Sequence, residues 1–221
     1  MGVLSLLGDR LQVVNAGVGE AGRPNTWVDI GAWRTDQHVE QYARQVIRSG
    51  GRSEVVDINI DREVSKRIYA GCGDSCDTRA PTVRVEVLRT SLSRWRRDNG
   101  LDYLVLFVRS DNSRALLGPL ATSKAGVGLG LIPGSVAVAR SATVFAFVEA
   151  IVIEAETGQV LTSTGFFNNG FVDAGVPTPA AGRWPEGGEA VFSRAIRQQL
   201  EDGVDVALEQ LGLLGPVAAS G

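Results

Sequence analysis

The sequence has a single histidine, His38, and only two cysteines, Cys72 and Cys76, among its 221 residues. A structural zinc site needs four ligands from Cys and His, so these side chains offer half a site at best. A serine or cysteine nucleophile most simply uses histidine as its base, which makes His38 the one candidate. It lies one turn before Tyr42 in a predicted helix, where a half-buried or surface histidine is the simpler interpretation. We predict no catalytic residue, no metal site and no cofactor.

No stretch is both long and apolar enough to span a bilayer, since SATVFAFVEAIVIEAETG is interrupted by Glu149 and Glu154. The net charge of −3 gives no overall attraction to nucleic acid. The basic residues gather only around Trp95, which fits an apolar helical stripe and leaves its neighbours on a solvated face: Arg89, Arg94, Arg96 and Arg97. We therefore predict neither a transmembrane segment nor nucleic-acid binding.

The first residues, MGVLSLLGDRLQVV, lack the basic region and small-residue cleavage site of a signal peptide. Either the protein is cytosolic, or an export signal has been removed. Aromatic residues make up only 6% while glycines number 27, which indicates tight turns and close backbone packing in a sheet-rich protein. Without a repeat or linker, we expect one globular domain over 1–215 and a frayed tail at 216–221.

The chain alternates between strand and helix patterns. Strands are predicted at 3–14, 26–33, 54–60, 101–110 and, as an antiparallel meander with a hairpin turn at Glu156-Thr157-Gly158, over 124–167. Helices are predicted after a Thr35 cap, from Asp61, over 82–99 and near the C-terminus. The first has an apolar stripe of Val39, Tyr42, Ala43, Val46 and Ile47, and at the start of the third TVRVEV also alternates like a strand. The last has an apolar face of Val191, Ala195, Ile196, Leu200, Val204, Ala207, Leu208 and Leu211. We predict an α/β (α+β) fold, a mixed sheet with about four helices packed on it.

Residues 118–134, GPLATSKAGVGLGLIPG, suggest a phosphate-binding loop. A Walker A loop needs a glycine immediately before its lysine, a hydroxyl after it, and then a helix. Here Ser123 precedes Lys124 and Ala125 follows it, and the next residues are poor helix formers. The dinucleotide pattern fails as well, because Leu131 and Pro133 stand where its last glycine belongs. We predict a glycine-rich strand and turn.

Cys72 and Cys76 form C-G-D-S-C, one residue longer than a C-x-x-C redox motif. A disulfide across this short loop would imply an oxidising compartment, and two free thiols remain the alternative. A second region of interest is the irregular stretch 168–187, which contains Asn168-Asn169-Gly170 and three prolines. Long ordered loops often carry function, so we regard it as a candidate binding loop with the polar residues Asp173, Arg183, Trp184 and Glu186.

The order of a helix, the strand LDYLVLFVRS and strands ending in VIEAETGQVLTSTG resembles the αβ unit of two bacterial cell-envelope families. These are the curli-secretion lipoprotein and the N-terminal domain of the Tol-system β-propeller protein. Their D-x-x-T-G hairpin is matched by Glu154, Thr157 and Gly158, with glutamate at the aspartate position and Glu156 within the motif. The opening VLSLLGDRLQVV also resembles uncharacterised proteobacterial proteins that often carry export signals.

This resemblance implies a non-enzymatic module, in the periplasm or associated with the envelope, that binds or assembles with other envelope proteins. The alternative is a cytosolic nucleotide-binding protein or enzyme that uses residues 118–134. The exposed alternation of the late strands leaves a sheet edge available for pairing, which is compatible with a homodimer.

Overall fold

A computed structural model describes the chain over residues 1–14, 25–51, 54–61, 64, 67–70, 82–110, 127–133, 141–173, 175–179 and 182–214. In chain order its strands and helices are β1 (Gly2–Leu6), β2 (Arg10–Val13), β3 (Thr26–Asp29), η1 (Gly31–Trp33), α1 (Thr35–Ser49), β4 (Tyr69–Ala70), β5 (Thr82–Val83), η2 (Val85–Leu88), α3 (Arg89–Asn99), β6 (Tyr103–Arg109), β7 (Leu129–Ile132), β8 (Ala142–Glu154), β9 (Val160–Val172) and α4 (Gly188–Gln210). The predicted tail 216–221 lies outside the described residues.

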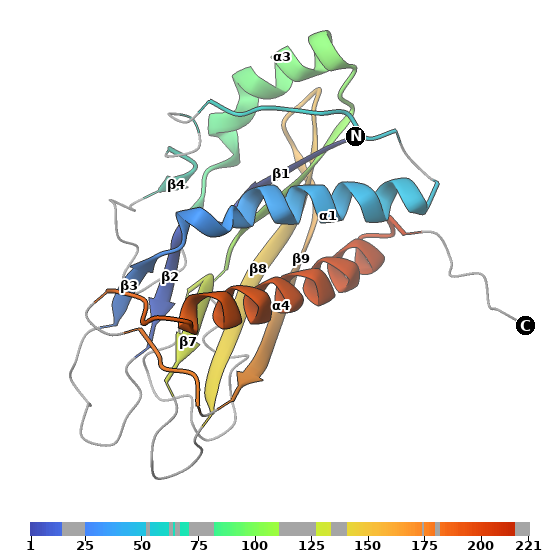
Figure 1. The fold of residues 1–221 in the computed structure, drawn as a ribbon. Coiled ribbons are helices and arrows are strands. Elements are labelled where there is room, and N and C mark those ends of the chain that lie inside the picture. The colour runs from blue at the N-terminus through green and yellow to red at the C-terminus, as the bar shows by residue number, and fades with distance from the viewer. Residues whose placement is uncertain are drawn as a thin grey trace, which may run out of the picture.

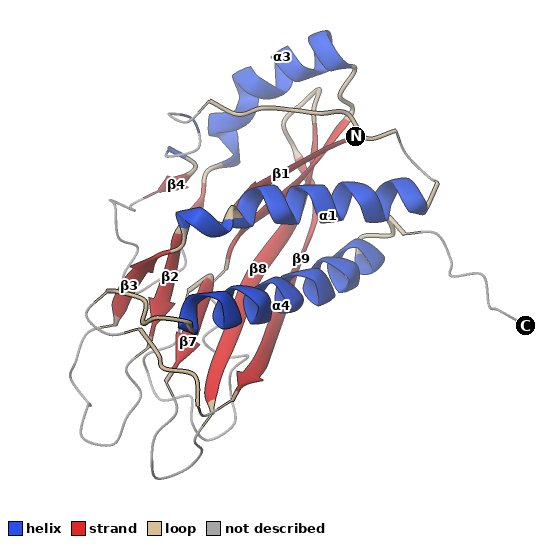
Figure 2. Ribbon diagram, in the orientation of Figure 1, coloured by secondary structure: helices blue, strands red, loops and turns tan. Residues whose placement is uncertain are grey.

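Seven strands form one mixed sheet, and β4 and β5 form a separate two-stranded ribbon. The long strand β8 pairs with β9 along one side, and along the other side with β6 and β7, which lie end to end. Next to these, β1 runs parallel to β6, β2 runs parallel to β7, and β3 closes the sheet antiparallel to β2. The predicted α/β fold with a mixed sheet is confirmed (Figure 2).

Two helices cover one face of the sheet and one covers the other. Figure 1 shows α1 and α4 side by side across the sheet, and α3 apart from them near the β8–β9 turn, where Arg96 pairs with Glu156. The α1–α4 side buries a large core that contains Phe107, Phe166 and Phe192, whereas Leu88, Leu92 and Trp95 pack on the opposite face. The described residues hold three α-helices, so the prediction of about four was wrong. Of the helix predicted from Asp61, residues 62, 63, 65, 66 and 71 lie outside them, and the prediction is wrong at its end, where Tyr69–Ala70 is the strand β4.

The long predicted strand over 3–14 is interrupted. The chain leaves the strand conformation at Leu7, and Gly8 has a left-handed backbone with φ of +77° that glycine adopts without steric cost. The strand predicted at 26–33 ends at Asp29 and is followed by a short 3-10 helix. The predicted strand 54–60 is wrong, because this segment makes only an isolated parallel bridge, between Gly2 and Val56.

The antiparallel meander is confirmed, since β7 and β9 both run antiparallel to β8. Its turn is held by the Thr157 hydroxyl, which donates to Glu154 Oε2 at 2.7 Å, and by the Gly158 N–H, which donates to the Glu154 carbonyl at 2.8 Å. The strand β9 continues to Val172. The loop predicted at Asn168-Asn169-Gly170 is therefore wrong, because these residues pair with β8.

The helix predictions hold better in their interiors than at their ends. Val39, Ala43 and Ile47 are buried in α1 as predicted, but Arg34 is the N-cap and Thr35 is the first helical residue. The predicted helix 82–99 begins as strand and 3-10 helix, becomes α-helical at Arg89, and ends at the left-handed Gly100. In α4, Val191 is 39% exposed rather than in the core, where Phe192 and Gly203 lie instead.

Candidate functional site

Two of the sequence motifs fall largely or wholly outside the described residues. Cys72 and Cys76 lie there, and so does Lys124 with the rest of 118–126. The described half of the glycine-rich stretch contains β7, which confirms a glycine-rich strand rather than the helix that a Walker A loop requires. Gly130 lies against the Phe145 ring, so the missing side chain allows close packing within the sheet.

The candidate binding loop at 168–187 is anchored by Trp184. Its ring lies 5.2 Å from the Trp33 ring and 5.6 Å from the Phe192 ring, measured between centroids, and its Nε1 donates to the Asp29 carbonyl at 3.2 Å. Asp173, Arg183 and Glu186 are exposed, and no hydrogen bond or ion pair between described residues links them to one another. Trp184 therefore fixes the entry to α4 on the sheet, and the four side chains do not form one site.

His38 lies at the contact between α1 and α4. Its Nε2 is 2.9 Å from Glu201 Oε1, and one turn on the Tyr42 hydroxyl donates to Asp205 Oδ2 at 2.9 Å. Burial, reinforced by the hydrogen bond and charge of Asp205, raises the pKa of Tyr42 to about 12. These polar contacts join the two helices, and the contact with Glu201 gives His38 a structural role between α1 and α4.

A cluster of buried carboxylates lies where the sheet is interrupted. Asp36 accepts hydrogen bonds from the Ser5 hydroxyl at 2.7 Å, the Leu7 N–H at 2.6 Å and the Gly8 N–H at 3.1 Å. One turn further along α1, Glu40 accepts from the Ser5 N–H at 3.0 Å and from Arg44 at 3.1 Å. The sequence shows the i, i+4, i+8 spacing that places Asp36, Glu40 and Arg44 on one helix face, but it does not show that they contact β1. The sequence analysis missed this cluster.

The hydrogen bonds of this cluster hold α1 against β1 and the turn that follows it. Every hydrogen bond to Asp36 and the Ser5 N–H bond to Glu40 come from the edge of β1 or from the turn after it. Arg44 donates to the Val3 carbonyl at 3.3 Å, and the Val56 N–H donates to the Met1 carbonyl at 2.8 Å. The outer edge of β1 is thus closed by α1 and by the segment around Val56, so that no further strand can pair with it.

The cluster predicts a pH dependence of stability. Burial is the largest influence on both carboxyl groups, and it raises the pKa of Asp36 and of Glu40 despite their hydrogen bonds and the nearby Arg109 and Arg44. The folded protein then binds these protons more tightly than the unfolded chain. The stability they contribute is fully present below the ordinary carboxyl pKa of about 4, and it is lost as the pH rises through the raised values.

Urea unfolding of the wild type and of Glu40→Gln between pH 4 and 7 measures this effect. Because the variant removes one titrating group, we expect the stability of the wild type relative to the variant to fall as the pH rises. A relative stability that rises with pH would show that the hydrogen bonds to Glu40 outweigh its burial.

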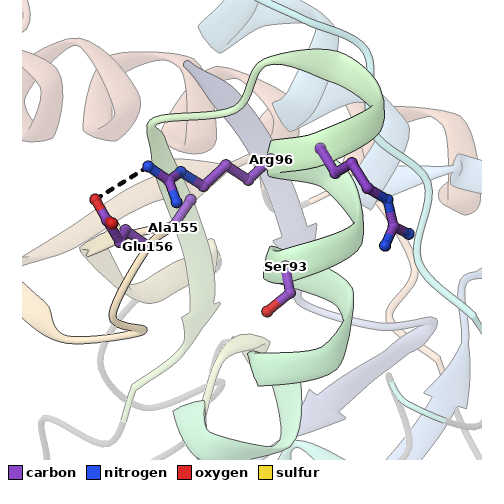
Figure 3. Close-up of a pocket in the computed structure, with 5 residues that line it drawn as sticks. Ser93, Arg96, Ala155 and Glu156 are labelled. Carbon is purple, nitrogen blue, oxygen red and sulfur yellow. Dashed lines mark ion pairs between the residues drawn. The ribbon is translucent and has the colours of Figure 1, made fainter.

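One hollow lies between α3 and the β8–β9 turn, with a volume of about 360 Å³. Figure 3 shows Arg96 and Glu156 facing each other across it, and their side chains form an ion pair of 3.1 Å. Arg97 pairs with the neighbouring Asp98 at 3.0 Å, and all four side chains are about half exposed or more. The solvated arginine face predicted beside Trp95 is confirmed, and Arg96 and Arg97 form their ion pairs with carboxylates of the same chain.

The most distinctive surface is the outer edge of β9. This strand has 13 residues, VLTSTGFFNNGFV, none of them charged and none proline. It pairs with β8 alone, and among the described residues no backbone hydrogen bond reaches its other side. Large apolar side chains are exposed at both of its ends, with Val160 at 42%, Leu161 at 49% and Phe171 at 78%. We refer to this outer side of Val160–Val172 as the β9 edge.

The opposite side of the sheet differs from the β9 edge. There β1 is closed as described above, and the short β3 has Trp184 Nε1 bonded to its last carbonyl. Edge strands in natural proteins are usually short, charged, bulged or covered, because an open edge invites pairing with another chain. Among the residues that the structure describes, none of these protections covers most of the β9 edge, and the one irregularity in its pairing lies next to the turn.

No protein-family model matches the chain, and no curated protein matches its sequence significantly. In the part of the chain that the structure describes, there is no group of three or more metal-ligating side chains. No helix there has the length and apolar character needed to cross a membrane.

Proposed function

We propose that this chain is a non-enzymatic assembly module of the bacterial cell envelope, which acts through contact between polypeptides. The observation that carries the proposal is the β9 edge, 13 residues long without a charge or a proline. Backbone N–H and C=O groups along such an edge are ready to pair with a strand of another chain. The resemblance of the helix, β6 and the β8–β9 hairpin to envelope proteins supports the location.

The alternative, a nucleotide-binding protein using 118–134, finds no support in the described half of that stretch. Phosphate binding by such a loop depends on backbone N–H groups at the start of a following helix. Leu129–Ile132 is instead a strand between β2 and β8. The ion pairs of Arg96 and Arg97 likewise favour structural roles over phosphate contacts.

Photo-crosslinking in the native bacterium tests the assembly role. We would place benzoylphenylalanine at Ser163, which is exposed in the middle of β9, and as a control at the exposed Arg94 on α3. We expect covalent adducts with a polypeptide from position 163 and none from position 94. Equal yields at the two positions, or no adduct at 163, would contradict the proposal.

Fractionation of the full-length gene product tests the location. We expect recovery with the envelope and a Cys72–Cys76 pair that resists alkylation until it is reduced, since disulfides persist in oxidising compartments. Recovery from the cytosol with both thiols free would overturn the envelope assignment and leave the crosslinking result unaffected.

A further inference from the structure

We propose that the partner of the β9 edge is a second copy of this chain, with the two β9 strands antiparallel around a two-fold axis at Phe166. The proposal rests on the assembly function above and names the partner that binds the β9 edge. It joins the two seven-stranded sheets into one continuous sheet.

The hydrogen bonds of β8 determine which β9 groups face outward. The Phe147 N–H donates to Gly128 and its carbonyl accepts from Ser110, so Phe147 bonds toward β6 and β7. Its neighbours Ala146 and Val148 must then bond toward β9, where they lie opposite Asn168 and Phe166. The backbone N–H and C=O groups of the even-numbered residues of β9 therefore form hydrogen bonds with β8. From Ser163 to Phe171 the N–H and C=O groups of the odd-numbered residues point to the open side, and Leu161 is the extra residue at the register shift next to the turn.

Antiparallel pairing about Phe166 matches these outward groups with one another. Each odd-numbered residue lies opposite another odd-numbered residue of the second copy, which is the requirement for a ladder of hydrogen-bonded pairs. The regular part of the ladder runs from Thr162 to Gly170 on each strand, and the register shift at Leu161 lies just beyond its end. A two-fold pair of this kind is isologous and closes on itself, so it produces a dimer rather than a fibre.

The side-chain pattern of β9 is self-complementary in this register. Within the regular ladder, hydroxyls meet an amide or a glycine, and glycine meets an aromatic ring beside the axis. The opposed pairs there are Thr162 with Gly170, Ser163 with Asn169, Thr164 with Asn168, and Gly165 with Phe167; beyond the ladder, the apolar Val160 and Leu161 lie next to Phe171 and Val172 of the second copy. The exposed side chains Leu161 and Phe171 are thus brought together twice, once on each side of the axis.

The side chains on the two faces of β9 differ. Phe167 lies over Gly165 within its own strand, since a Cβ at Gly165 would be 2.7 Å from the ring, so the space over this glycine is filled by the same strand. On the other face, α4 follows the edge of β9: Asn168 Nδ2 donates to the Gln199 carbonyl at 2.8 Å, and the Thr164 hydroxyl donates to Gln210.

Gln199, Gly203, Val206 and Gln210 have the spacing i, i+4, i+7, i+11, which places them along one side of α4. Val206 is 44% exposed on this stripe beside the β9 edge. No charged residue of β9 opposes another across the axis, so like-charge repulsion does not act against the pairing. If the partner were an unrelated strand, the side chains of β9 would not need to be complementary to one another about Phe166.

Charge reversal tests both the edge and the register. We would compare the wild type with a double lysine variant, Leu161→Lys with Phe171→Lys, and a double glutamate variant, Leu161→Glu with Phe171→Glu. In the proposed register each variant sets like charges next to one another at two places. By sedimentation at micromolar concentration we expect a dimeric wild type, and a dimer dissociation constant raised at least tenfold in each variant.

An equimolar mixture of the two variants should form dimers again, because lysine then faces glutamate at both places. The matched control is Ser163→Ala, which keeps the outward backbone groups and should remain dimeric. Circular dichroism verifies that each variant is folded, as expected for substitutions of exposed side chains. Variants that dimerise alone as well as the wild type does, or a mixture that stays monomeric, would overturn the register.

The outcomes also separate this inference from the proposed function. A wild type that is monomeric at 100-fold higher concentration, together with an adduct from position 163 to a different protein, would overturn self-pairing and leave the assembly role standing. A monomeric wild type without any adduct would overturn both. An adduct of twice the mass of the chain would support both.

Discussion

Replacing Asp36 by alanine should lower the free energy of unfolding by about 3–5 kcal/mol. The carboxylate accepts three hydrogen bonds, from the Ser5 hydroxyl and from the Leu7 and Gly8 N–H groups. Alanine leaves these donors without their acceptor where the chain turns from β1 into β2. It also removes the negative charge that attracts Arg109. Burying the Asp36 carboxylate costs free energy, but removing it leaves three donors without an acceptor. We expect the loss of these hydrogen bonds to be the larger effect.

Urea unfolding at pH 7 measures this change, and Asp57→Ala is its control. Asp57 also makes an ion pair, 3.3 Å from Arg44, but its side chain is 83% exposed. Exposed ion pairs contribute about 0–1 kcal/mol, so the control should stay within that range. If Asp36→Ala were no more destabilising than Asp57→Ala, the interruption of the sheet would have to be stabilised by other contacts.

The interruption between β1 and β2 illustrates a limit of sequence analysis. The residues Val3 to Val14 have the apolar character of one long strand, and all of them except Gly8, Asp9 and Arg10 are buried. The chain bends at Gly8 because Asp36, 28 residues away, binds the N–H groups there. Periodicity predicts strands and helix faces from neighbouring residues, and it contains no information on a contact between distant ones.

A similar override explains the errors at 168–170 and at Trp184. Asn168-Asn169-Gly170 has the composition of a turn, but its backbone pairs with β8 over the full length of a long hairpin. Local preference is a weaker influence than pairing with an available strand. Trp184 stands in an irregular, proline-containing stretch that favoured a binding loop, and only the fold shows that its ring packs between Trp33 and Phe192.

The elements predicted best are those with a long, strongly periodic pattern. The α1 stripe of Val39, Ala43 and Ile47 and the buried β6 follow from hydrophobic spacing alone. The sequence also predicted an available edge among the late strands. It could not show which edge, because this depends on the order of strands in the sheet: β8 is enclosed by β6 and β7 on one side, which leaves β9 outermost.

Replacing Gly130 by alanine should cost about 2–3 kcal/mol. This residue lies in the middle of β7, where a Cβ would meet the ring of Phe145 and would lie 2.7 Å from the backbone carbonyl of Gln12. A flexible side chain could move aside, but the Gln12 carbonyl belongs to the neighbouring strand β2. Phe145 is fully buried and stacks on Phe147 with centroids 4.7 Å apart, so its ring has little space to shift. The added methyl group must therefore push β7 away from its neighbours.

Gly175→Ala provides the matched control in thermal and urea unfolding. A Cβ at Gly175 has no atom within 4 Å, and this residue does not have a left-handed backbone, so the same chemical change should alter stability by less than about 0.5 kcal/mol. A small effect at both positions would show that β7 can move outward without loss. A large effect at Gly130 alone would show that the glycines of this stretch serve close packing between strands, which is the role that separates them from a phosphate-binding loop.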